Sequence, residues 1–163
     1  MMRPVTRRLL GSVRAASGSP KHVTLTENFV AGNPTFRNCT VVSGKHKITS
    51  DIPVAGGGED KGMSPKEILM SALASCTAMT IRTVFEGSKL KAPNAWDGAD
   101  LSGISITVAE HGDHPHVPSK LTVDINLSGA LTEEQKKRLL RAADACPVKK
   151  IITGQTPVES AIV

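Results

Sequence analysis

The sequence has few aromatic residues and few cysteines. It contains no Tyr, one Trp and three Phe among 163 residues, so it offers little surface on which the bases of single-stranded nucleic acid could stack. Its three cysteines are too few for a secreted disulfide scaffold, and none forms a Cys-x-x-Cys pair, which excludes a thioredoxin-type motif and a zinc knuckle. No apolar run approaches the ~20 residues of a membrane span. These absences indicate one globular domain in a reducing compartment.

The formal net charge of +5 comes from the start of the chain. Residues 1–26 contain five basic and no acidic residues, and the remaining fifteen basic and fifteen acidic residues cancel. The folded part is therefore close to neutral, and we expect no nucleic-acid partner. The leader, residues 1–20, is rich in Arg, contains Ser and lacks acids, which predicts a mitochondrial transit peptide. The alternative is a disordered basic tail, for which the expected location is the cytoplasm.

The order of strand and helix signals predicts an α+β fold in a single domain over residues 21–163. Short strands separated by Gly and Pro precede a glycine-rich loop that we expect to be flexible, and longer alternating strands and a second helix follow the central helix. The predicted strands cover residues 21–29, 35–42, 45–52, 99–111, 117–128 and 158–163; the loop covers 53–62 and the second helix runs from Thr132 to about Ala143.

The central helix has a clear start signal. Ser64 stands at the N-cap, Pro65 at the first helical position and Glu67 three residues after the serine, which predicts a capping box. Residues 68–81 carry no charge and alternate small residues with Leu, Met and Ile. A helix that is apolar all round must be surrounded by protein. We therefore expect a long, buried central helix that ends near Gly87.

Two cysteines lie in settings that suggest thiol redox chemistry. Cys76 is in the middle of the apolar helix, where desolvation alone raises a thiol pKa. Cys146 precedes Pro147, which would place its sulfur at a helix start, close to Lys149 and Lys150. Local chemistry therefore favours Cys146 as the thiolate that attacks. Cys39, in a predicted strand, is expected to be structural.

The segments 64–76 and 142–148, which contain these two cysteines, resemble the OsmC/Ohr family of thiol-dependent peroxidases. The resemblance spans residues 22–163. It implies an intertwined homodimer with the central helices packed together and two active sites at the interface. It also implies that Cys76 attacks an organic hydroperoxide or hydrogen peroxide, that Cys146 resolves the sulfenic acid as a disulfide, and that a dithiol reductant, lipoyl-type in part of the family, restores both thiols without a cofactor.

The same resemblance nominates two further site residues. Arg37, the sole arginine between the leader and Arg82, matches the family's activating arginine, and Glu67 matches a glutamate near the start of the central helix. Lys66 departs from the pattern, because the commonest family spacing has the glutamate directly after the proline. Nine residues at ~100° each place Glu67 on the opposite side of the helix from Cys76, ~13 Å along the axis. Glu67 would have to act through a partner chain or Arg37, and otherwise it only caps the helix.

The sequence leaves other interpretations open. Cys76 alone would be an ordinary small core residue. His111, His114 and His116 surround Asp113 in a turn, where histidines are more often solvated than metal-bound, so no metal is expected. The competing function is a non-catalytic redox-sensing or lipid-like ligand-binding module on the same fold. Steady turnover of hydroperoxide with a dithiol would exclude that competitor.

Overall fold

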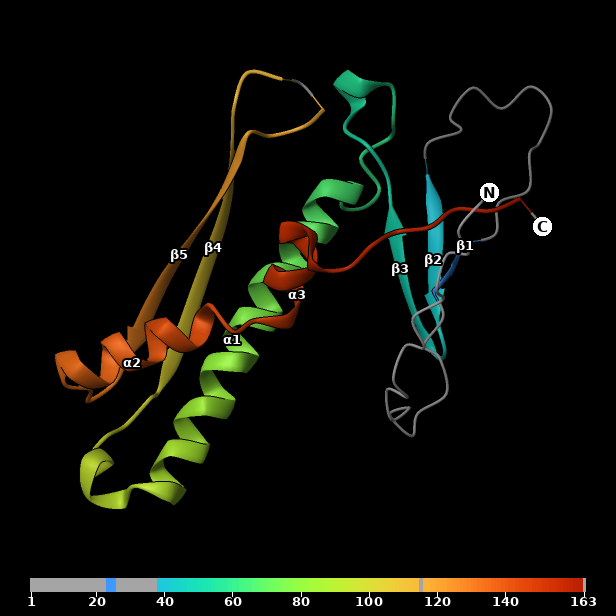
Figure 1. Ribbon diagram of the computed structural model, residues 1–163. Helices are drawn as coiled ribbons and strands as arrows, with labels where there is room; N and C mark the ends of the chain where they lie inside the picture. Colours follow the sequence, from blue (N-terminus) through green and yellow to red (C-terminus); the bar gives the residue numbers. More distant parts are fainter. Residues whose placement is uncertain (1–22, 26–37, 115, 163) are drawn as a thin grey trace, which may run out of the picture.

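The computed structural model describes residues 23–25, 38–114 and 116–162. Eight main elements, joined by short 3₁₀ turns, follow one another in the α+β order that the sequence predicts (Figure 1). They are β1 (Thr24–Leu25), β2 (Cys39–Ser43), β3 (His46–Ser50), α1 (Pro65–Lys91), β4 (Gly103–His111), β5 (Lys120–Ser128), α2 (Glu133–Ala143) and α3 (Pro147–Lys150).

The strands form two separate antiparallel sheets. The first has the order β1-β2-β3, and its β2–β3 hairpin closes at Gly44, whose φ of 58° is available to glycine without strain. The second is the β4–β5 hairpin, paired from Gly103 opposite Ser128 to His111 opposite Lys120. In Figure 1 α1 and α3 lie between the two sheets, α2 crosses the lower part of the β4–β5 hairpin, and α1 runs diagonally beside β4.

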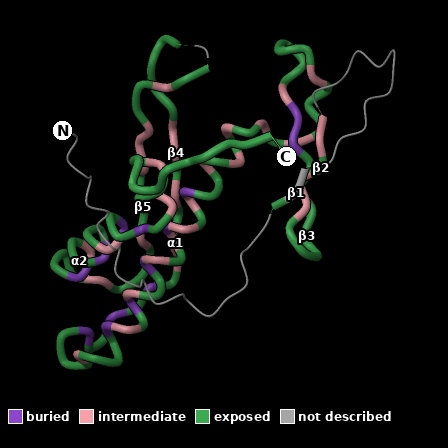
Figure 2. Tube along the Cα trace, turned by 45° about the vertical axis from the view of Figure 1, so that its right-hand side comes forward, coloured by how far each residue is buried: buried purple, intermediate pink, exposed green. Residues whose placement is uncertain are grey.

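The core lies where the C-terminal half of α1 meets α2 and the β4–β5 hairpin. The ring of Trp96, in the 3₁₀ turn Pro93–Trp96, packs edge-on against Phe85 with 5.6 Å between ring centroids. Figure 2 shows the buried positions following α1 into this region. The buried cluster comprises Ile81, Phe85, Trp96, Ala99, Leu101, Leu139 and Ala143.

The glycine-rich loop between β3 and α1 is ordered by Asp51. The Asp51 carboxylate, 1% exposed, accepts hydrogen bonds from the backbone N–H groups of Ile52, Glu59 and Lys61 at 2.8–3.1 Å. The bond from Lys61 is the largest cause holding the pKa of this carboxyl below its usual range, although burial opposes it. The prediction of a flexible loop was therefore wrong, because one buried acceptor fastens three of its amides.

Two further expectations need correction. Residues 158–162 form no strand: they lie in irregular, exposed chain, and Val158 is 89% exposed. The central helix is long but mostly not buried, since only Leu73, Thr77, Ile81, Phe85 and Ser88 are buried along its length. The described elements cover one side of α1. The helix also continues past Gly87 to Lys91.

By length and composition α1 could cross a membrane, but one such helix is weak evidence. Its buried positions pack on protein, against α2, α3 and β4.

Candidate active site

The fold brings together the two cysteines that stand 70 positions apart in the sequence. Cys76 lies in the middle of α1 and is half-buried, whereas Cys146 is the N-cap residue of α3 and has no exposed surface. Their side chains interact, both as free thiols. The two thiols are therefore neighbours, and their pairing as a disulfide and their separate roles stay predictions.

The surroundings of Cys146 favour its thiolate form. Burial raises the pKa of the Cys146 thiol, but interactions with the backbone N–H of Lys149, the side chains of Cys76 and Thr77, and the backbone N–H of Val148 together lower it below its usual value. The Cys146 thiol forms no capping hydrogen bond to α3, so the amides of Val148 and Lys149 lower its pKa from a longer distance. This direction agrees with the sequence-based expectation of a thiolate at a helix start.

The turn that carries Cys146 is held by several backbone hydrogen bonds. The N–H of Cys146 donates to the carbonyl of Ala143 at the end of α2, and the N–H of Lys150 donates to the carbonyl of Cys146, both at 3.2 Å. The Lys149 ammonium is 2.5 Å from the Asp144 carboxylate. Because hydrogen bonds hold both ends of this turn, the position of the Cys146 sulfur relative to α1 is fixed.

Cys76 borders an uncovered part of α1. Leu69, Ala72 and Met79 occupy positions −7, −4 and +3 relative to it, so they share its stripe of the helix. All three are exposed, Leu69 by 47% and Met79 by 62%. No charged residue interrupts this part of the helix between Ile68 and Ile81. Cys76 can thus be approached from an apolar surface, whereas Cys146 lies behind it.

Glu67 lies in the first turn of α1, nine residues before Cys76. Glu67 is exposed and completes the predicted capping box: its Oε2 accepts from the N–H and the hydroxyl of Ser64, both at 2.7 Å. Lys66 pairs with Glu110 of β4 at 3.0 Å. Cys39 lies in β2 opposite Ser50, as a strand residue. Arg37 is outside the described residues.

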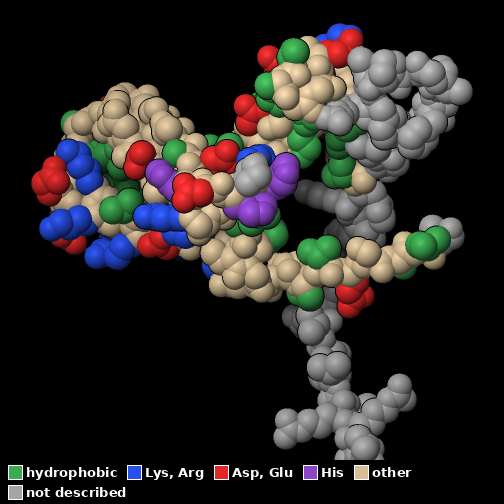
Figure 3. All heavy atoms as spheres, turned by 90° about the horizontal axis from the view of Figure 1, so that it is seen from above, with side chains coloured by type: hydrophobic (Ala, Val, Ile, Leu, Met, Phe, Trp, Pro, Cys, Tyr) green, Lys and Arg blue, Asp and Glu red, His purple; other side chains and the backbone are tan. Residues whose placement is uncertain are grey.

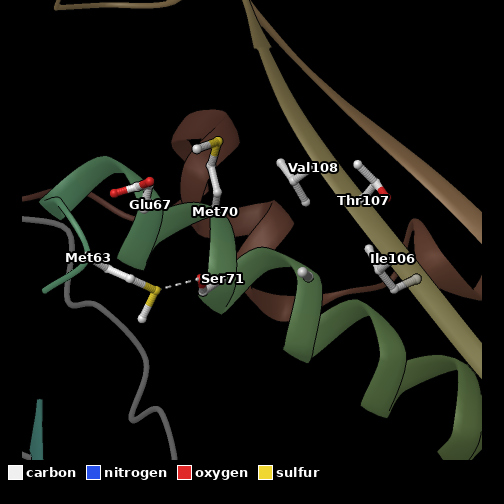
Figure 4. A pocket seen from close by; sticks show the side chains of 8 residues that line it. Met63, Glu67, Met70, Ser71, Ile106, Thr107 and Val108 are labelled. Atoms are coloured by element: carbon white, nitrogen blue, oxygen red, sulfur yellow. Dashed lines mark hydrogen bonds between the residues drawn. The ribbon is translucent and has the colours of Figure 1, made fainter. Parts of the chain in front are cut away.

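A cavity of about 370 Å³ opens between α1 and β4. Figure 4 shows Ile106, Thr107 and Val108 of β4 on one side, and the first turns of α1 with Met63 on the other. The Ser71 hydroxyl donates to the Met63 sulfur at 3.6 Å. Neither thiol lines this cavity, which is lined by Met63, Glu67, Met70, Ser71, Ala74, Ile106, Thr107 and Val108.

The described residues contain no group of His, Cys, Asp and Glu side chains that could hold a metal ion. The Nδ1 of His114 instead accepts hydrogen bonds from the backbone N–H groups of His116 and Val117, so this histidine stabilises the β4–β5 connection. On the face seen in Figure 3, Lys and Arg side chains are interspersed with Asp and Glu. That face therefore carries no patch of one charge sign.

Sequence reasoning missed two residues of this region, Asp51 and Thr77. Asp51 orders the loop before α1, and Thr77 contributes a buried hydroxyl beside Cys146. The signal for Thr77 was available, since it is a polar residue directly after Cys76 in a helix without charges. Its inward orientation depends on how α1 packs against α3, which the sequence does not specify.

Several known structures share this fold. An OsmC-like protein from Mycoplasma pneumoniae is similar with a TM-score of 0.60 and 16% identity, over 83% of this chain and 89% of that one. An organic hydroperoxide resistance protein OsmC from Legionella pneumophila is similar with a TM-score of 0.57 and 22% identity, over 83% and 90%. An OsmC-like protein of unknown function from Vibrio cholerae gives 0.61 and 14%, over 82% and 94%.

A comparison with curated protein sequences found no match. The sequence model of the OsmC-like protein family, by contrast, matches residues 58–161, which include α1, both strands of the second sheet and both cysteine segments. The chain therefore belongs to the OsmC-like protein family.

Proposed function

We propose that this protein reduces organic hydroperoxides through Cys76 and Cys146. The observation that carries the proposal is the contact between an approachable thiol on α1 and a fully buried thiol at the start of α3. The family includes organic hydroperoxide resistance proteins such as the one from Legionella pneumophila. A nucleophile must be reached by its substrate, whereas a resolving thiol only has to reach the nucleophile.

The cycle has three balanced steps. The Cys76 thiolate attacks the terminal peroxide oxygen, the O–O bond breaks, and with one proton the products are Cys76 sulfenic acid and an alcohol. The Cys146 thiolate then attacks the Cys76 sulfur, forming the S–S bond, and the displaced hydroxide leaves as water after protonation. A dithiol reductant, lipoyl-type in our proposal, reduces the disulfide by two electrons and becomes a disulfide itself.

The lowered pKa of Cys146 suits the second step of the cycle. The Lys149 N–H and the Cys76 and Thr77 side chains lower the pKa of this thiol despite its burial, which favours the thiolate that attacks the Cys76 sulfur. The apolar stripe of Leu69, Ala72 and Met79 beside Cys76 suits an alkyl or lipid hydroperoxide better than a small polar one. The apolar stripe that would bind the substrate therefore lies beside the proposed nucleophile.

We further propose that the active form is an intertwined homodimer. Two surfaces that are normally covered are open among the described residues: the charge-free face of α1, and the strands β2 and β3, which stand apart from the helices in Figure 2 and consist mostly of exposed residues. A second copy packed along α1 would cover Cys76 and complete an apolar site. It would also offer the one way for Glu67, and for Arg37, to serve a thiol on the other side of the helix.

The test is the intact mass and peptide map of the reduced protein after one equivalent of cumene hydroperoxide, with free thiols blocked before digestion. We expect a rapid Cys76–Cys146 disulfide. Cys146→Ser should consume one equivalent and retain a sulfenic acid, whereas Cys76→Ser should not react. Cys39→Ser is the matched control and should behave like the wild type. Unchanged thiols in the wild type would overturn the proposal and favour a ligand-binding or sensing role.

The proposed location is the mitochondrion, because of the basic, acid-free leader at residues 1–20. A fluorescent fusion of the full chain should reach mitochondria. The same fusion with the leader's four arginines replaced by glutamine should stay in the cytoplasm. Equal distributions of the two fusions would refute this location.

A further inference from the structure

Another cavity, of about 230 Å³, opens between α2 and the 3₁₀ turn Pro93–Trp96. Two arginines of α2, Arg138 and Arg141, contribute to its lining. They stand three positions apart, so their side chains leave neighbouring points on one face of the helix. Neither of the proposed active-site thiols lines this cavity, which is lined by Ala95, Trp96, Glu134, Gln135, Arg138 and Arg141.

The charges around this cavity favour an anion. Arg141 Nη2 lies 3.8 Å from Glu134 Oε1, and 69% and 78% of the two side chains are exposed. An exposed pair of this kind contributes little free energy, so a ligand can compete for the arginine. Arg138 forms no ion pair among the described residues. With two arginines and one glutamate, the lining has a formal charge of +1.

The guanidinium of Arg138 lies over the ring of Trp96, with 5.7 Å between Cζ and the ring centroid. A guanidinium held over an aromatic face keeps N–H donors that can bind an oxyanion through two parallel hydrogen bonds. Trp96 is 2% exposed, and its indole N–H has no hydrogen-bond partner among the described residues. This N–H is covered, so a ligand oxygen could reach it only after a side-chain movement.

A buried glutamine holds the two walls of the cavity together. The Gln135 side chain donates from Nε2 to the carbonyl of Ala95 at 3.0 Å, and its Oε1 accepts the N–H of Thr132 at 2.9 Å. The first bond joins α2 to a turn 40 positions earlier in the chain. Because the walls are in place before a ligand binds, little ordering of the protein opposes binding.

We propose that this cavity binds a phosphate group, either of free phosphate or of a small phosphorylated molecule. Two adjacent guanidiniums offer more donors than one carboxylate can use, and a phosphate brings a further oxygen and a higher charge. The inference goes beyond the proposed reduction of hydroperoxides and does not depend on it, since neither Cys76 nor Cys146 lines the cavity.

The test uses the fluorescence of Trp96, the single tryptophan of the chain. The reduced full chain is titrated with sodium phosphate at neutral pH, with sodium chloride holding the ionic strength constant. We expect a saturable change in emission, because a bound phosphate alters the contact of Arg138 with the ring. Glycerol phosphate is titrated in parallel. Tighter binding of the ester would identify a phosphorylated small molecule as the ligand, and tighter binding of phosphate would identify the free ion. A response to neither would overturn the proposal.

Three substitutions at exposed positions test the assignment of the site. Arg141→Gln leaves Arg138 over the reporting ring and should weaken phosphate binding by about tenfold or more, as expected for the loss of one charged hydrogen-bond donor. Glu134→Gln removes the acid beside Arg141 and should tighten binding. Arg82→Gln is the matched control, since it removes one exposed arginine of α1 that pairs with Glu86 outside the cavity, and it should bind like the wild type. Equal affinities of Arg141→Gln and Arg82→Gln would show attraction to net charge alone and overturn the site.

Discussion

Glu67, in the capping box at the start of α1, has two suggested roles, helix capping and catalysis. The two roles can be tested separately. Ser64 Oγ accepts the Glu67 N–H at 3.3 Å, and Glu67 Oε2 accepts the Ser64 N–H at 2.7 Å. Ser64→Ala removes the first acceptor, which costs about 1 kcal/mol in comparable caps. Because α1 packs against α2, α3 and β4, we expect this loss to appear in the free energy of unfolding of the whole protein. It corresponds to about a fivefold smaller ratio of folded to unfolded protein.

Urea denaturation measures this loss. With a slope of roughly 2 kcal/mol per molar urea, the midpoint of Ser64→Ala should fall by about 0.5 M. The pKa of the Glu67 carboxyl is held below its usual range by the Ser64 side chain and then the Ser64 N–H. Its contribution is therefore present above the unfolded-state pKa and is lost as pH falls through the folded-state pKa. The difference between variant and wild type should shrink in acid.

Glu67→Gln separates capping from catalysis. Glutamine still accepts the Ser64 N–H, so this variant should lose less stability than Ser64→Ala, but it has no negative charge. An unchanged rate of Cys76 oxidation would leave Glu67 as a cap, whereas a slower rate at unchanged stability would assign it to the active site. The structural reasoning would be refuted if Ser64→Ala unfolded at the wild-type midpoint.

Three further predictions concern stability. Leu139→Ala, at a core position with no exposed surface, should cost about 2–5 kcal/mol in urea denaturation, and a loss under about 1 kcal/mol would contradict the assigned core. Gly58→Ala would place a Cβ 1.9 Å from a backbone carbonyl oxygen and should lower the midpoint, whereas Gly87→Ala, in open space, should raise stability by up to about 1 kcal/mol. The lowered pKa of Asp51, caused chiefly by the Lys61 N–H, stabilises the loop above its unfolded-state pKa. Amide exchange over residues 52–62 should therefore accelerate as pH falls through the folded-state pKa, relative to α2 in the same sample, and parallel changes would refute the role of Asp51.

Local signals predicted the elements whose ends are fixed by nearby residues. The start of α1 at Ser64, and α2 after the Thr132 cap, follow from capping boxes that both form as expected. The β4–β5 hairpin follows from alternation, although both strands begin later than predicted, at Gly103 and Lys120. Each of these features involves side chains within four residues or a period of two, so a sequence alone contains the information.

The failures occurred where a distant partner decides the conformation. The loop before α1 was expected to be flexible because of its glycines, yet the Asp51 carboxylate collects amides from up to ten residues away. The expected strand near Val158 pairs with no described strand, and burial of α1 was predicted from its composition although the described elements cover only one of its sides. The same holds for the thiols: local chemistry indicated a thiolate at Cys146, but it could not indicate how deeply that sulfur lies.

Acidity and accessibility are divided between the two sulfurs, and this division decides which of them can react first. Cys146 has the lowered pKa, because the Lys149 N–H and the side chains of Cys76 and Thr77 outweigh its burial, yet it has no exposed surface to meet a hydroperoxide. Cys76 can be approached from the apolar stripe of α1. A buried acidic thiol is protected from overoxidation and attacks only the sulfur placed beside it. The lowered pKa of Cys146 agrees in direction with the expectation from local chemistry, and the difference in access favours Cys76 as the thiol that reacts first and Cys146 as its resolving partner.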